Sequence, residues 1–146
     1  MSPLKRVPEL RKLSEDHHHG LVLARRARRA AEENEDSIAH TWKEVESKFK
    51  NELEPHFQIE EKYLIPPLEA LGKTELAKRT NDEHRKLRES VNEGAERSAA
   101  GLKEFGEMLE QHIRFEEREL FEEAQRLLSS DDLKAIEKAC EPPPHS

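Results

Sequence analysis

Apolar residues recur every three or four positions along four long segments, and this spacing constrains the fold more than any other feature of the chain. The interval places them on one face of an α-helix, and no long stretch shows the alternation typical of a strand. Short connections between the segments favour antiparallel packing of successive helices. The pattern predicts an all-α protein, an up-down-up-down antiparallel four-helix bundle with a short C-terminal helix, over residues 8–33, 37–64, 74–101, 102–127 and 132–139.

Local signals predict where these helices begin, end and bend. Ser37 is the expected N-cap of the second helix, Thr74 offers a cap for the third, and Gly101 is expected to end the third. Pro55 lies inside the second helix, where it lacks an N–H donor and clashes one turn back, so a kink is expected just before His56. The sequence leaves open whether this kink is only a tolerated bend or also orients His56.

Composition limits the class of protein. The 146 residues suit a single domain, predicted over residues 1–140, with a disordered Pro-rich tail over residues 141–146. Charged residues make up 39% of the chain, which suits thin apolar stripes on helices with charged outer faces. A net charge of −7 argues against nucleic acid as a partner. No apolar run approaches the ~20 residues of a membrane span, and the N-terminus lacks the apolar part of a signal peptide, so a cytoplasmic protein is expected.

Two stretches of the chain are similar to each other: "HFQIEEKYL", which starts at His56, and "HIRFEEREL", which starts at His112. In each, a glutamate follows the histidine by four positions, so both side chains point the same way on a helix. Both pairs lie in phase with the apolar stripe of their helix, as does one histidine in each of the other two long helices. The polar residues predicted to face the core are His17, His56, Glu60, His84, His112 and Glu116.

Six polar groups on the inner face predict a metal site. A buried charge must be paired, protonated or bound to a metal, because its desolvation is costly. The alternative is a structural bundle with surface ion pairs, which any single HxxxE pair would favour in so charged a chain. That alternative weakens because all four helices contribute a polar group in phase with the stripe.

The two halves of the chain each supply two imidazoles and one carboxylate, which predicts two metal ions related by a quasi-twofold axis and bridged by the glutamates. Imidazole with carboxylate suits iron, manganese or zinc. With six ligands for two ions, coordination positions stay open for a bridging oxygen and an outside ligand.

The apolar stripe also chooses among the remaining histidines. Within the triplet it selects His17, with His18 as the fallback ligand and His19 exposed to solvent. His40 and His145 lie outside the motif and are expected in solvent.

Three residues beside the motifs have predicted roles. Glu61 and Glu117 could accept the second N–H of a ligating imidazole on a neighbouring helix, or could equally face solvent. Tyr63, one turn beyond Glu60, could approach the metals.

The order H…HxxxE…H…HxxxE of the six residues resembles the hemerythrin-like, or HHE cation-binding, family over roughly residues 9–128. The resemblance implies a four-helix bundle that holds a non-haem di-iron centre, with two iron ions and a bridging oxo or hydroxo group. It also implies a small-molecule partner such as O2, peroxide or NO.

The chain departs in two places from the oxygen-carrying hemerythrins of marine invertebrates. Their third helix has a second ligand histidine four positions before the first, where this chain has Thr80. Their last carboxylate is an aspartate five positions after its histidine, whereas Glu116 follows His112 by four. The missing imidazole implies a further open position on one iron, which argues against reversible oxygen carriage.

The leading hypothesis is therefore a di-iron protein that binds or senses O2 or a related small ligand. A peroxide-decomposing or NO-handling di-iron enzyme and an iron storage or delivery protein are the alternatives, so the sequence leaves open whether the protein is an enzyme. A ferritin-like carboxylate oxidase is set aside because its ExxH spacing occurs only once, from Glu15 to His18.

Overall fold

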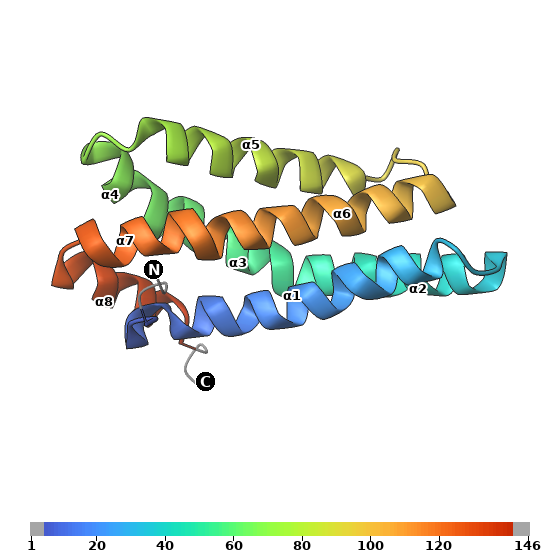
Figure 1. Cartoon of the computed structure of the whole chain (residues 1–146), viewed down its shortest axis with the longest axis horizontal. Coiled ribbons are helices and arrows are strands. Elements are labelled where there is room, and N and C mark those ends of the chain that lie inside the picture. Colours follow the sequence, from blue (N-terminus) through green and yellow to red (C-terminus); the bar gives the residue numbers. More distant parts are fainter. Residues whose placement is uncertain (1–4, 142–146) are drawn as a thin grey trace.

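The computed structural model describes residues 5–141, which form four long helical segments side by side and one short helix at an end of the bundle (Figure 1). Successive long segments run in opposite directions, so the predicted all-α up-down-up-down bundle is confirmed, and no strand occurs within the described range. The first segment comprises η1 (Pro8–Leu10) and α1 (Arg11–Ala30), and the third is α5 (Thr74–Ser90). The second comprises α2 (Glu35–Lys48), η2 (Phe49–Leu53), α3 (Glu54–Ile59), η3 (Glu60–Leu64) and α4 (Ile65–Ala70). The fourth comprises α6 (Ala99–Phe115), η4 (Glu116–Leu120) and α7 (Phe121–Leu127), and the short helix is α8 (Ser130–Ala139).

Three predicted helix signals are wrong, although α5 does begin at Thr74 as predicted. Asn34, not Ser37, is the N-cap of α2, and its side chain accepts a hydrogen bond from the Ser37 N–H. Lys73, not Thr74, is the N-cap of α5, and its side chain makes no capping hydrogen bond. The third helix ends at Ser90, and Gly101 lies instead in the first turn of α6.

The error at Gly101 has a steric explanation. Its N–H donates to the Oγ of Ser98, the N-cap of α6, at 3.0 Å. A side chain at this position would lie 3.0 Å from the Glu96 carbonyl oxygen and 3.4 Å from the Trp42 ring. The glycine therefore permits close packing at a helix start, whereas the sequence suggested a helix end.

Three π-helical turns interrupt the second and fourth segments. One covers Phe49–Leu53, just before Pro55, and is closed by a hydrogen bond from the Glu54 N–H to the Phe49 carbonyl. A widened turn of a continuous helix therefore lies in the region where the kink was predicted. The other two turns begin at Glu60 and Glu116, and π turns of this kind are frequent at functional sites.

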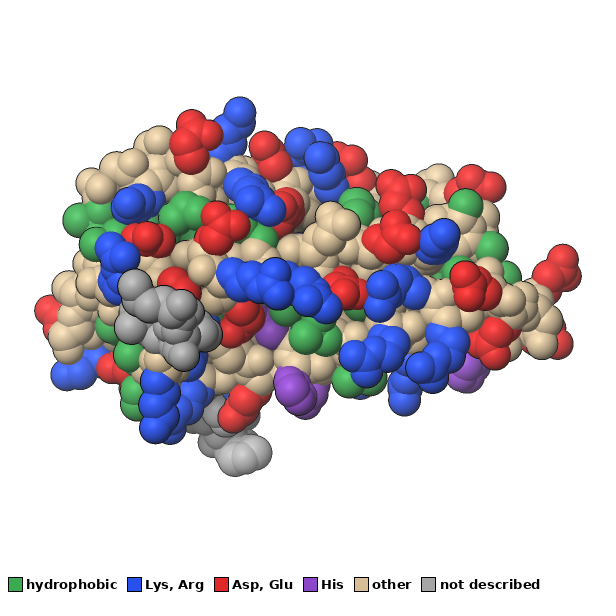
Figure 2. Space-filling view, viewed as in Figure 1, with side chains coloured by type: hydrophobic (Ala, Val, Ile, Leu, Met, Phe, Trp, Pro, Cys, Tyr) green, Lys and Arg blue, Asp and Glu red, His purple; other side chains and the backbone are tan. Residues whose placement is uncertain are grey.

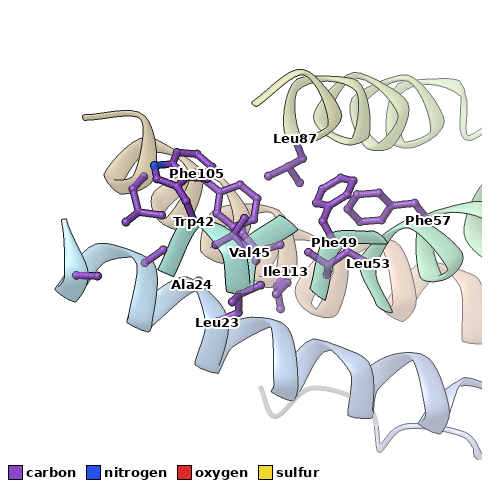
Figure 3. Close-up of a cluster of buried hydrophobic side chains, with 14 residues drawn as sticks. Leu23, Ala24, Trp42, Val45, Phe49, Leu53, Phe57, Leu87, Phe105 and Ile113 are labelled. Atoms are coloured by element: carbon purple, nitrogen blue, oxygen red, sulfur yellow. The ribbon is translucent and has the colours of Figure 1, made fainter. Parts of the chain in front are cut away.

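Buried apolar side chains form two clusters along the bundle. The first includes Trp42, Phe57 and Phe105 and is drawn in Figure 3. The second, which includes Leu64 and Phe121, is formed mainly around α4, α7 and α8. Along the second and fourth segments the HxxxE pairs lie between residues of the two clusters, so the apolar interior is divided where the polar residues lie.

Acidic and basic side chains are interspersed over the face shown in Figure 2, as expected for helices with charged outer faces. Within residues 5–141, every helix is too short or too polar to cross a membrane. His145 and nearly all of the predicted tail lie outside the described residues.

Candidate metal centre

The structure brings together all six residues that were predicted to face the core. Each is at most 5% exposed, whereas His18 and His19 are exposed, so the stripe chose the inward histidine of the triplet correctly. The six form two groups of four, in each of which the candidate ligand atoms all lie within 4.8 Å of one another. The groups are His17, His56, Glu60 and Glu116, and Glu60, His84, His112 and Glu116.

The two shared glutamates lie between the two pairs of histidines. Oε1 of Glu116 is 2.7 Å from Nε2 of His17 and 3.8 Å from Nε2 of His56. Its Oε2 is 3.0 Å from Nε2 of His112 and 3.4 Å from Nε2 of His84. Glu60 makes the complementary contacts, 3.1 Å to His56 and 3.0 Å to His84. Each of the two glutamates therefore belongs to both groups of candidate ligands.

An outer carboxylate holds the other ring nitrogen of every histidine. A carboxylate only accepts, so each Nδ1 carries a proton and each Nε2 faces the centre. This fixes the orientation of all four rings toward the centre of the cluster. The Nδ1 partners are Glu117 for His17 (2.6 Å), Asp16 for His56 (3.1 Å), Glu61 for His84 (2.7 Å) and Glu83 for His112 (2.7 Å).

Two of these four acids were predicted and two were missed. The contacts of Glu61 and Glu117 confirm that they accept from imidazoles on neighbouring helices. Asp16 and Glu83 were missed because only the glutamates next to Glu60 and Glu116 were considered as acceptors. The signal was the likeness of "SEDH" and "NDEH", in which an acid immediately precedes the histidine of the first and third helices.

Each Glu-Glu pair encloses one imidazole from another helix. Glu60 and Glu61 contact the two ring nitrogens of His84 at 3.0 and 2.7 Å. Glu116 and Glu117 contact those of His17 at 2.7 and 2.6 Å. Both pairs open a π turn, in which successive residues are separated by a smaller angle than in an α-helix, so neighbouring glutamates can reach the same ring.

The carboxylates also control the protonation of the metal-free cluster. Burial lowers the pKa of His84, but its close contacts with Glu116, Glu60 and Glu61 outweigh burial and raise this pKa to about 11. Burial likewise lowers the pKa of His112, but the negative charge of Glu116 and the contact with Glu83 raise it to about 9. Burial raises the pKa of Glu116, but the neighbouring imidazoles, His112 foremost, hold it well below its ordinary value. Protons therefore compensate the inner carboxylates when no cation does.

The cluster fits a cation better than it fits protons alone. Glu60 Oε1 and His112 Nε2 are buried and have no hydrogen-bond partner within the described residues, although each lies 3.0 Å from a group of opposite charge. Buried polar groups are rarely left this way. Two imidazole nitrogens and two carboxylates per position are donors that suit divalent iron, manganese or zinc.

The model of the hemerythrin HHE cation binding domain matches residues 9–124, which include all six inward residues. The chain belongs to the hemerythrin HHE family. Comparisons with curated proteins and with solved structures gave no match. The buried cluster of this hemerythrin-like domain is thus a site able to hold metal cations.

Two other residues singled out from the sequence lie away from this arrangement or are bonded elsewhere. Tyr63 lines a surface groove beside Pro67 and Leu127, not the centre. Thr80 is fully buried on α5, and its hydroxyl donates to the Leu76 carbonyl at 2.8 Å. The helix α5 therefore contributes a single imidazole to the hemerythrin-like site.

Proposed function

We propose that the chain is a non-haem di-iron protein that binds or senses O2 or a related small ligand such as peroxide or NO. One observation supports this most strongly: the two four-residue groups share Glu60 and Glu116, and every histidine directs Nε2 between them. Two ferrous ions would supply exchangeable coordination positions and the electrons needed to bind or reduce such a ligand.

The residues of the chain have separate tasks in this proposal. Glu60 and Glu116 bridge the two positions and compensate positive charge where solvent does not reach. The four outer carboxylates keep the proton on Nδ1 of each ring, so the lone pair of Nε2 stays available to bind a metal ion. Four protein donors per position, two of them shared, leave room for a small ligand.

A peroxide-decomposing or NO-handling enzyme is the second candidate, and Thr80 favours it. Position 80 is a threonine, so the third helix supplies one imidazole where oxygen carriers have two. The Thr80 hydroxyl does not take the place of the second imidazole, because it donates to the Leu76 carbonyl. A more accessible iron favours peroxide turnover over reversible binding. Steady consumption of H2O2 by the wild type that disappears in His112→Ala would support this candidate.

The first experiment is the metal content of freshly purified protein together with its visible absorption spectrum. We expect about two irons per chain and ligand-to-metal charge-transfer absorption. His17→Gln should hold fewer, whereas His18→Gln, its exposed neighbour in sequence, serves as the matched control and should equal the wild type. Near-zero metal after anaerobic loading with ferrous iron would contradict the proposal and favour a purely structural bundle.

A further inference from the structure

Arg88, on α5, contacts both of the groups that fix the orientation of His84. Its Nη1 and Nη2 donate to the two oxygens of Glu61 at 2.8 and 3.2 Å, and Glu61 accepts from Nδ1 of His84. Its guanidinium carbon also lies 5.6 Å from the centre of the Phe57 ring, within the range of a cation–π contact. Phe57 stacks on His84, with ring centres 4.0 Å apart and planes 15° apart. One arginine therefore holds the hydrogen-bond acceptor and the stacked ring of the same imidazole.

Arg6, in the segment before α1, makes the same two contacts around His17. Its Nη2 donates to the side chain of Glu117 at 3.2 Å and to the backbone carbonyl of Glu117 at 3.0 Å. Glu117 accepts from Nδ1 of His17. The guanidinium carbon lies 5.7 Å from the centre of the Phe121 ring, which stacks on His17 at 4.9 Å and 15°.

The two arrangements do not follow from the internal similarity of the chain. When His17 is aligned with His84, the position equivalent to Arg88 is Leu21 and the position equivalent to Arg6 is Lys73. Arg6 also precedes the residues matched by the family model. The same contacts thus arise from positions that the internal similarity does not relate. The need to orient both imidazoles explains them better than a repeated helix surface does.

The other two outer acids pair with more exposed cations of their own helix. Lys12 pairs with Asp16 and Arg79 with Glu83, but the side chains of Lys12 and Arg79 are 55% and 50% exposed. Exposed pairs on one helix contribute little. The side chains of Arg6 and Arg88 are 15% and 33% exposed and reach acids on other elements, so they restrict their partners more strongly.

We propose that Arg6 and Arg88 are positioning residues, each of which keeps one imidazole aimed at one metal position. The inference rests on the proposed di-iron function. Arg88 bonds both carboxylate oxygens of Glu61, and Arg6 bonds the side chain and the backbone carbonyl of Glu117, so each limits the rotation of its acid. A carboxylate that cannot rotate fixes the ring it accepts from. Loss of the acid that supports a ligand histidine weakens metal binding about 10–100-fold, so loss of the arginine behind it is expected to cost about tenfold.

The test uses the full chain loaded with ferrous iron and a chromogenic chelator that reports iron release. Arg88→Met should speed release of one of the two irons about tenfold. Arg6→Met should speed release of the other, and the double variant should speed both. Arg85→Met is the matched control, because Arg85 lies on the same helix and, among residues 5–141, forms ion pairs only with Asp82 and Glu89 near the surface.

The outcomes separate the two proposals. A wild type that binds no iron overturns the proposed function. A wild type that binds iron, with Arg6→Met and Arg88→Met releasing it no faster than Arg85→Met, overturns the positioning role alone.

A second measurement separates positioning from ordinary structural support, since Arg88 also bonds Glu54 on α3. In a Glu61→Gln background, Arg88→Met should have a smaller effect on iron release than in the wild type, because its route through Glu61 is gone. The visible spectrum of the cobalt(II)-loaded protein should also change in Arg88→Met and not in Arg85→Met. A full tenfold effect in the Glu61→Gln background, or an unchanged cobalt spectrum, would overturn the proposal.

Discussion

Replacement of Glu116 by glutamine in the metal-free protein tests the electrostatics of the cluster directly. Glu116 is fully buried and its oxygens lie 2.7 to 3.8 Å from the Nε2 atoms of all four histidines. Removing one partner of a buried ion pair costs about 3–5 kcal/mol, because the opposite charge is left without compensation. For a domain of this size each kcal/mol lowers the melting temperature by about 2–4 °C, so Glu116→Gln should lower it by about 6–20 °C.

Two variants provide the scale for that measurement. Glu60→Gln removes a charge with two such contacts, to His56 and His84, and should cost less than Glu116→Gln. Glu119→Gln is the matched control, because this side chain is 54% exposed and its one ion pair within the described part of the chain is with Arg79, at 3.5 Å. An exposed pair of that kind contributes about 0–1 kcal/mol.

The assay is thermal unfolding followed by circular dichroism in the presence of a strong chelator. The expected order of destabilisation is Glu116→Gln first, Glu60→Gln second and Glu119→Gln last. A melting temperature for Glu116→Gln equal to that of Glu119→Gln would refute the view that Glu116 links the four imidazoles. With ferrous iron present, Glu116→Gln should also hold fewer irons than the wild type, since it alters a donor common to both positions.

Three further predictions concern the same molecule. Asp16→Asn should weaken iron binding about 10–100-fold by chelator competition, while Glu15→Gln, an exposed neighbour, should have no effect. The pKa of His84 is raised from 6.5 to about 11, so the stability it contributes to the metal-free protein is present below pH 6.5 and declines above it; unfolding of chelated protein should be easier at pH 9 than at pH 7. Gly106→Ala would place a Cβ 2.7 Å from a backbone carbonyl of α1 and should destabilise the bundle by about 1–3 kcal/mol in denaturant titrations, with Gly94→Ala, which has open space, as the control.

The sequence predicted the bundle and the convergence of the six inward residues because one periodicity governs both. Residues such as His56 and Glu60 lie on the apolar stripe, and a stripe that must be buried takes its polar members inward with it. Their assignment as ligands of iron stays a prediction for the metal analysis. Glu61 and Glu117 were also within reach of sequence reasoning, because their distance around the helix from the inward glutamates is fixed.

Other features of the fold and of the site were not predicted, because they depend on contacts between elements that no local sequence pattern reveals. Arg6 reaches Glu117 across more than a hundred positions of sequence, and only the packing of the N-terminal segment on the fourth helical segment makes this possible. Gly101 was misread because glycine serves both at helix ends and where a helix start packs closely. The π turn at Glu116 escaped prediction because no proline lies near it to signal a disturbance.

The division of the apolar interior into two clusters has a consequence for how the protein opens. Apolar contacts that make a bundle unfold as one unit are interrupted at the layer of imidazoles and carboxylates. In the chelated protein the end formed by α4, α7 and α8 should behave as a separate cooperative unit, with amide protons that exchange sooner than those of the cluster around Trp42 and Phe105. Cations bound between the clusters would join both ends, so metal loading should slow hydrogen exchange far from the site as well as at it.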